Sequence, residues 1–114
     1  MQQIIFSVPV LPRKKQALKE LVAEISGPKR TDYSSSNKKY GVHKETWFLR
    51  SSPQGDWVSV YWEADDIQKV FSEFAMSKVP IDVWLKKKLK EITGIDYNQP
   101  SSEQPPEQLF KYGY

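Results

Sequence analysis

His43 is the only histidine in this 114-residue chain, and it is the first candidate for chemistry. An imidazole titrates near neutral pH, so it can take up and release protons as a general acid or base. Glu45 follows two residues later, and alternation along a strand would put both side chains on one face, where the carboxylate could orient the ring. The simpler interpretation is a surface histidine at a strand end, beside a glutamate that forms salt bridges.

Asp82 is the second candidate, because it follows Pro80 at the start of a predicted helix. An acidic side chain in the first turn interacts favourably with the helix dipole, by about 0.3–1 kcal/mol, and this effect alone can explain it. The alternative is that Asp82 points into a pocket, where it would handle a proton or anchor a ligand.

Aromatic side chains with polar ring atoms, together with Glu45, form a candidate ligand-binding set. They are Trp47, Trp57, Tyr61, Trp62 and Trp84. Such rings line pockets for flat or apolar ligands, but they are also common in cores and at subunit interfaces. We therefore expect most of them in the core or an interface, with one or two bordering a cavity.

Other kinds of site find little support in the composition. The absence of cysteine excludes disulfides, thiolate metal sites and a cysteine nucleophile. A single histidine and no spacing that gathers three ligands argue against a metal site, and we expect no cofactor. The basic run Arg13-Lys14-Lys15 at a helix start could hold an anion, although a solvated turn is simpler.

The net charge of +3 is small and argues against nucleic acid as a partner. No stretch approaches the roughly 20 apolar residues of a membrane span, and the first residues lack a signal-peptide layout. We therefore expect a cytoplasmic protein without a membrane partner.

The elements that must position these residues begin with a strand over residues 4–10, where apolar residues alternate. Leu18, Leu21, Val22 and Ile25 then recur at helical spacing, which predicts an amphipathic helix. Residues 29–41 are polar and serine-rich, and we predict a loop there, either a functional flap or simply disordered.

Residues 42–50 and 57–63 predict a hairpin around Ser52-Pro53-Gln54-Gly55. A four-residue connection would pair Leu49 with Val58, Trp47 with Val60 and Glu45 with Trp62. A slip by one residue would instead place Trp47 opposite Tyr61, and the sequence alone leaves this choice open.

After the hairpin, Asp65 and Asp66 are suited to begin one helix and Pro80 a second, which Gly94 would end. We assign residues 1–97 to one α+β domain and residues 98–114 to an extended tail. Within the tail, residues 109–112 could form a short last strand or dock on another subunit.

This order predicts a ferredoxin-like βαββα(α)β fold, with an antiparallel sheet and helices on one face. Large apolar side chains point to both faces of the hairpin, so the second face also needs a cover. Two such sheets packed face to face would provide it, which favours a homodimer.

The chain resembles a group of small uncharacterised bacterial proteins of the dimeric α/β-barrel superfamily, which includes the antibiotic-biosynthesis-monooxygenase-like proteins. The resemblance covers roughly residues 3–96 and is most specific in the segment Ser77-x-x-Pro80-Ile81-Asp82. The other matching segments are Glu45-x-Trp47-Phe48-Leu49, Gly55-x-Trp57, Tyr61-Trp62-Glu63-Ala64-Asp65-Asp66, Phe74 and Trp84.

The resemblance implies a homodimer whose two sheets form a barrel, with a pocket between sheet and helices in each subunit. Members of the superfamily include cofactor-free oxygenases, lactone isomerases and haem-handling enzymes, so the fold alone does not select a reaction. In the related proteins, polar residues, often histidine, flank the Pro-Ile-Asp segment. Here Val79 and Leu85 stand there, and no catalytic role is carried over.

Three functions remain open at this point. The leading hypothesis is a homodimeric small-molecule-binding protein or cofactor-independent enzyme with an aromatic-lined pocket. The first alternative is a structural or interaction module without chemistry, since no catalytic motif is present. The second is RNA binding on the aromatic sheet face, with which dimerisation would compete.

Overall fold

The computed structural model describes residues 1–99 and 105–113. Within these residues the chain forms three strands and four helices. In chain order they are β1 (Gln2–Val10), α1 (Lys15–Ser26), α2 (Arg30–Tyr40), β2 (Val42–Ser52), β3 (Gly55–Ala64), α3 (Ile67–Met76) and α4 (Pro80–Thr93).

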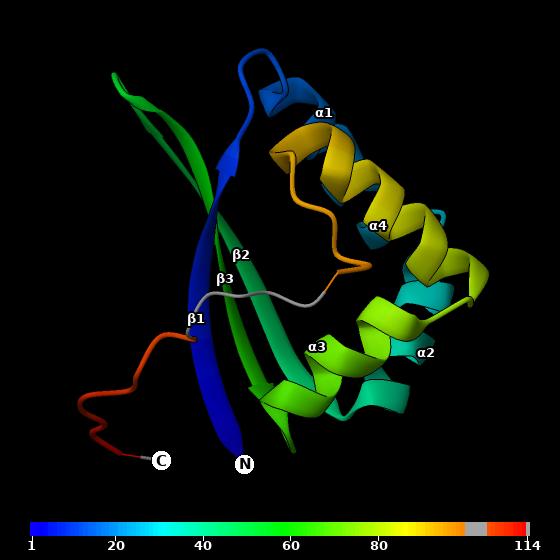
Figure 1. Cartoon of the computed structure of the whole chain (residues 1–114), viewed down its shortest axis with the longest axis vertical. Helices are drawn as coiled ribbons and strands as arrows, with labels where there is room; N and C mark the ends of the chain where they lie inside the picture. Colours follow the sequence, from blue (N-terminus) through cyan, green and yellow to red (C-terminus); the bar gives the residue numbers. More distant parts are fainter. Residues whose placement is uncertain (100–104, 114) are drawn as a thin grey trace.

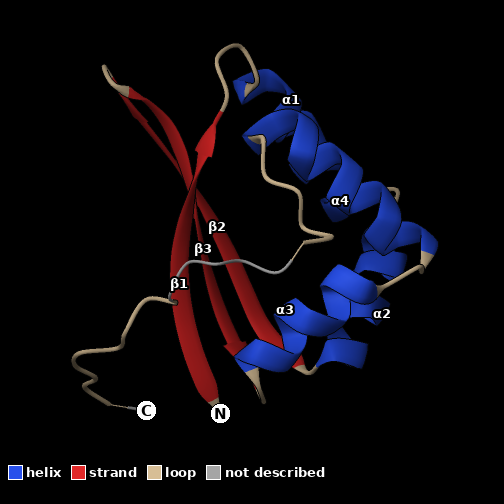
Figure 2. Ribbon diagram, viewed as in Figure 1, coloured by secondary structure: helices blue, strands red, loops and turns tan. Residues whose placement is uncertain are grey.

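The strands form one antiparallel sheet in the order β1-β3-β2, and the four helices all lie on one of its faces (Figures 1 and 2). The hairpin has the register expected for the four-residue connection: Leu49 pairs with Val58, Trp47 with Val60 and Glu45 with Trp62. On the other side of β3, Ile4 pairs with Trp62. Partners opposite one another share a face of the sheet, so this register decides which side chains meet the helices.

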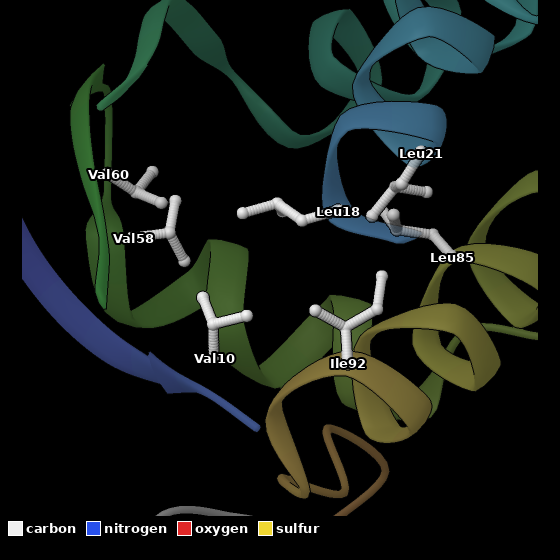
Figure 3. Packing of buried hydrophobic residues seen from close by; sticks show 7 residues of the cluster. All are labelled: Val10, Leu18, Leu21, Val58, Val60, Leu85 and Ile92. Carbon is white, nitrogen blue, oxygen red and sulfur yellow. The ribbon is translucent and has the colours of Figure 1, made fainter. Parts of the chain in front are cut away.

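The main hydrophobic core lies between the sheet and helices α1 and α4 (Figure 3). Val58 and Val60 of β3 point from the sheet toward Leu18 and Leu21 of α1. Val10, Leu85 and Ile92 complete the buried cluster. The alternation in β1 and the helical spacing in α1 therefore produce the packing that the sequence predicts.

The polar segment 29–41 is not a loop, and that prediction was wrong. Residues Arg30–Tyr40 form α2, which Gly41 ends in the left-handed conformation with φ of 78°. Serine has only modest helix propensity. Four residues at helical spacing, however, make contacts outside the helix, and these contacts stabilise it; they are Tyr33, Ser36, Asn37 and Tyr40.

The start of β2 contains an irregularity that also overturns an expectation. Val42 pairs with Ala64, but the next paired residue is Lys44, opposite Glu63, so His43 is an extra residue in the ladder. This β-bulge interrupts the alternation of side chains. Val42 and Glu45 consequently share the helix-facing side of the sheet, and His43 does not accompany Glu45.

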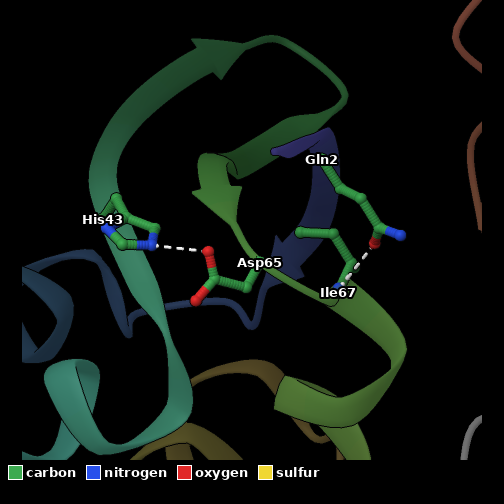
Figure 4. A network of polar contacts seen from close by, with 4 residues as sticks. All are labelled: Gln2, His43, Asp65 and Ile67. Carbon is green, nitrogen blue, oxygen red and sulfur yellow. Dashed lines mark hydrogen bonds and ion pairs between the residues drawn. The ribbon is translucent and has the colours of Figure 1, made fainter.

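The start and end of the last two helices agree with the sequence signals. The Asp66 carboxylate caps α3 by accepting a hydrogen bond from the Lys69 backbone N–H at 3.2 Å. The Ile67 backbone N–H donates to Gln2 Oε1 at 2.7 Å and ties α3 to β1 (Figure 4). Gly94 ends α4 in the left-handed conformation with φ of 79°.

The tail does not add a strand to the sheet in the part of the chain that the structure describes. Residues 109–112 have no regular secondary structure. Gln108 Nε2 donates to Gln3 Oε1 at 2.9 Å, which places this part of the tail beside β1. Leu109, Phe110 and Tyr112 are almost fully exposed. Among the described helices, none has the length and apolar character needed to cross a membrane.

Candidate functional site

A pocket of about 70 Å³ lies between the helix-facing side of the sheet and the helices. Phe6, Trp47 and Trp62 line it from the strands, and Phe74 and Leu85 line it from α3 and α4. The pocket brings together four of the residues proposed from the sequence, which are Glu45, Trp47, Trp62 and Asp82.

Glu45 is the polar centre of the pocket, and four groups donate hydrogen bonds to its carboxylate. Trp47 Nε1 and Trp62 Nε1 donate to Oε2 at 3.0 and 2.7 Å. Asn37 Nδ2 donates to Oε1 at 3.1 Å, and the Tyr33 hydroxyl donates to the same oxygen. A carboxylate offers about four acceptor positions, so the described protein groups occupy all of them.

Asp82 forms a second polar cluster in the same pocket. Its side chain is buried, with 2% exposed. Ser36 Oγ donates to Oδ1, and the hydroxyls of Tyr40 and Ser77 donate to Oδ2, each at 2.6 Å. Asp82 also lies in the first turn of α4, so both explanations offered for it apply: it meets the helix dipole and it lines the pocket.

The tyrosines in these clusters hold their protons strongly. Burial, followed by the neighbouring charge of Glu45, raises the pKa of Tyr33 well above its ordinary value. Burial, followed by the hydrogen bond to Asp82, raises the pKa of Tyr40. In both cases a phenolate would lie in a site with little water and beside a carboxylate, so the neutral hydroxyl is favoured.

The remaining wall of the pocket combines aromatic rings with valine and leucine side chains. The rings of Phe6, Trp62 and Phe71 contact one another with centroids 4.9–5.4 Å apart. Tyr97, from the segment after α4, lies 6.4 Å from Phe74 between ring centroids. Burial alone raises the pKa of Tyr97 to about 12. Residues after the last helix therefore contribute to the pocket as well.

Four proposed residues lie elsewhere, and one of them, Trp57, lies on the sheet face away from the helices. His43 Nε2 is 2.8 Å from Asp65 Oδ1, and both side chains are exposed at the edge of the sheet (Figure 4). Tyr61 lies on the sheet face away from the helices and donates to Glu63 at 2.8 Å. Trp84 borders a groove between α1 and α4, where Lys29 Nζ lies 4.7 Å from its ring centroid.

Sequence reasoning missed the contribution of α2 to the site. Tyr33, Ser36 and Asn37 reach the two carboxylates from this helix, together with Tyr40. A signal was present, because these positions have the i, i+3, i+4, i+7 spacing of one helix face. It was hidden because side chains with polar tips, rather than aliphatic ones, occupy that face.

In the described ranges no three side chains of histidine, cysteine, aspartate or glutamate gather as metal ligands. The N–H and O–H groups around Glu45 also occupy the carboxylate oxygens that a metal ion would need.

The fold is a ferredoxin-like α+β fold, with one antiparallel sheet and helices on one face. A solved structure with this architecture is the L-rhamnose mutarotase from Formosa agariphila, with a TM-score of 0.68. The match covers 99% of this chain and 100% of that protein, at 17% sequence identity, so it concerns the fold alone. No protein-family model matches the sequence. A comparison with curated proteins likewise finds no match.

Proposed function

We propose that this protein is a homodimer that binds a small molecule in the pocket between sheet and helices, either as a binding protein or as a cofactor-independent enzyme. The observation that carries the proposal is the Glu45 carboxylate, held by four donors in a pocket whose walls are mostly apolar. A partly buried charge costs free energy that a packed apolar core would not. Such clusters are concentrated at functional sites.

The donors and acceptors around the pocket restrict what the ligand can be. Tyr33, Ser36 and Tyr40 give their hydroxyl protons to Glu45 or Asp82. Toward a ligand, these three hydroxyls therefore offer oxygen lone pairs. The matching ligand is mostly apolar and donates hydrogen bonds.

The size of the pocket sets a second restriction. Its volume of about 70 Å³ is roughly half that of a 150 Å³ apolar cavity that takes up benzene. A ligand smaller than benzene fits the pocket as it stands. A ring such as a hexose requires the lining side chains to move apart.

If the pocket is catalytic, the reaction it supports is a proton transfer. The Tyr33 hydroxyl and the Glu45 carboxylate form a donor–acceptor pair, and Tyr40 and Asp82 form another. In such a transfer the tyrosine would first turn its hydroxyl from the carboxylate to the substrate, which frees one carboxylate oxygen to accept a proton while the tyrosine returns one. The L-rhamnose mutarotase of similar fold suggests sugar anomers as one substrate class to assay.

The four tryptophans provide a direct test of binding. The indole N–H groups of Trp47 and Trp62 face Glu45 inside the pocket, whereas Trp57 and Trp84 lie outside it. A fragment set including L-rhamnose would be titrated into ¹⁵N-labelled protein while the four indole signals are followed. Binding in the pocket shifts the Trp47 and Trp62 signals and leaves Trp57 and Trp84 in place.

The His43→Ala variant is the matched control, because His43 is exposed and pairs with Asp65 outside the pocket. It should bind the same fragments with unchanged affinity. If no fragment moves the Trp47 and Trp62 signals, or if the His43 variant loses binding, the pocket is not the functional site.

A further inference from the structure

We infer that the pocket selects a small organic cation, either a protonated amine or a quaternary ammonium ion. The inference rests on the proposed function, since it names the ligand class of the same pocket. Three independent properties of the lining residues support it: their charge, their aromatic faces and the direction of their hydrogen bonds.

The charge of the pocket is negative. Glu45 and Asp82 line it, and no lysine, arginine or histidine does so among the described residues. Within residues 1–99 and 105–113, the ion pairs are His43–Asp65 and Lys88–Glu91. Neither pocket carboxylate therefore has a cation of these residues within salt-bridge distance. Neutral donors satisfy the hydrogen bonds of Glu45 but leave its charge uncompensated.

Lys86 is the buried ammonium group nearest to this site, and its position makes the two carboxylates unequal. Its Nζ donates to the backbone oxygens of Ala75 and Ser77 at 3.1 and 3.0 Å, at the end of α3. Ser77 also bonds to Asp82, so Lys86 lies on the Asp82 side of the pocket. Glu45, which accepts hydrogen bonds from the Trp47 and Trp62 indoles, is farther from this ammonium group. It is therefore the carboxylate whose charge a ligand would balance.

The aromatic wall provides the second property. The face of an aromatic ring carries partial negative charge and attracts cations, most strongly for tryptophan. Trp47 and Trp62 line the pocket next to Glu45, and Phe6 and Phe71 pack beside Trp62. Aromatic rings combined with a carboxylate form the kind of site that binds ammonium groups.

The hydrogen bonds provide the third property. Tyr33, Ser36 and Tyr40 offer lone pairs, which an N–H group of a protonated amine can use. A metal ion is disfavoured, because the N–H groups of Asn37, Trp47 and Trp62 already occupy acceptor positions of Glu45. An anion would be repelled by Glu45 and Asp82, and the hydroxyl protons of Tyr33, Ser36 and Tyr40 are already donated to these carboxylates.

The test compares three probes of similar shape and the same number of non-hydrogen atoms: isopropylammonium, isopropanol and acetate. Each would be titrated into the full chain at pH 7, where the amine is protonated, with the Trp47 and Trp62 indole signals as readout. The expected result is that isopropylammonium binds at least tenfold more tightly than isopropanol, and that acetate leaves both signals unchanged.

A pair of variants assigns the preference to Glu45. In Glu45→Gln, the advantage of isopropylammonium over isopropanol should fall about tenfold. In Glu63→Gln, a carboxylate change on the opposite sheet face, the advantage should stay as in the parent protein. The probe comparison on the unaltered protein does not depend on how well either variant folds.

The outcomes separate the inference from the proposed function. If isopropanol or acetate binds as tightly as isopropylammonium, the pocket is real and the cation preference is wrong. If none of the probes, and none of the fragments tested above, moves either indole signal, both proposals are wrong.

Discussion

At the scale of single residues, the Glu45 carboxylate organises much of the pocket. It receives hydrogen bonds from α2, through Tyr33 and Asn37, and from both strands of the hairpin, through Trp47 and Trp62. Removing it would leave several donors without partners in a site with little water. Each unsatisfied buried group costs about 1–3 kcal/mol, less where water can enter.

Glu45→Ala should therefore lower the free energy of unfolding by about 2–4 kcal/mol. Glu45→Gln, which keeps one acceptor oxygen, should lower it by about 1–2 kcal/mol. Urea denaturation followed by tryptophan fluorescence measures both. The control is Glu63→Ala, because Glu63 accepts a bond from Tyr61 on the other sheet face. Equal losses for Glu45→Ala and Glu63→Ala would contradict the role given to Glu45.

The raised pKa values of Tyr33, Tyr40 and Tyr97 predict how stability depends on pH. In the unfolded chain a tyrosine loses its proton near pH 10, whereas in the folded chain these three keep it to higher pH. Their contribution to stability is thus fully present below about pH 10 and is lost as the pH rises toward their folded pKa values.

We therefore expect the free energy of unfolding to fall above about pH 10. The fall should be shallower in Tyr33→Phe, which removes one of the raised groups. Tyr112→Phe, a change in the exposed tail, should behave like the parent protein. Denaturation curves between pH 8 and 11 test this. Each unit of difference between the folded and unfolded pKa corresponds to about 1.4 kcal/mol. If the free energy of unfolding falls with pH as steeply in Tyr33→Phe as in the parent protein, Tyr33 is not buried beside Glu45 in solution.

At the scale of elements, helix α2 shows where local patterns are insufficient. Its Ser34-Ser35-Ser36 run indicates a loop by propensity, and only the contacts of Tyr33, Ser36, Asn37 and Tyr40 with other elements explain a helix. By contrast, α1, α3 and α4 could be predicted because aliphatic or aromatic residues mark their buried faces. For the hairpin, the sequence left two possible registers, and the structure has one of them. The bulge at His43 could not be predicted from the residue types.

The end of helix α2 can be tested at Gly41, which connects α2 to β2. Its φ is positive, and a Cβ atom added there would lie 2.9 Å from Asp65 Oδ2. Gly94, after α4, has almost the same φ, but an added Cβ would meet Leu11 only at ordinary contact distance. Backbone strain for alanine in this conformation costs about 1 kcal/mol or more.

Gly94→Ala should therefore lower the free energy of unfolding by about 1 kcal/mol. Gly41→Ala should lower it somewhat further, by about 1–2 kcal/mol, because the exposed Asp65 side chain must turn away from the added Cβ and weaken its contact with His43. Thermal and urea denaturation of the two variants measure the difference. If Gly94→Ala is the more destabilised variant, the close approach of Gly41 to Asp65 is not present in solution.

At the scale of the whole molecule, the sheet has one covered and one uncovered face (Figure 2). The uncovered face carries Ile5 and Phe48, which are 54% and 60% exposed, together with Trp57. The order of the elements predicted helices on one face, and the apolar residues on both faces of the hairpin predicted that the other face also needs a cover. The tail could not be placed in the same way, because Leu109 and Phe110 suit a strand yet form none in the described residues.

We expect the protein to be a dimer that buries the uncovered sheet face, with twice the 13.3 kDa mass of the chain. Phe48→Lys should produce monomers, because a charge in that interface would be desolvated without a partner. Met76→Lys, at an even more exposed position at the end of α3, should leave the dimer intact. Light scattering during size-exclusion chromatography distinguishes these masses. A monomeric parent protein would disprove the dimer, and salt-dependent RNA binding would then be the next measurement on that face.

The bulge at His43 also affects how this chain should be compared with others. One extra residue separates Val42 from Glu45, although both face the helices. A relative with a regular strand would therefore be one residue shorter at this point, and its alignment to this chain needs a gap at His43. Without that gap, each β2 residue on one side of His43 would be aligned with a residue of the relative whose side chain points to the opposite face of the sheet. At 17% identity, such a shift would conceal the counterpart of Glu45 even where the relative has one.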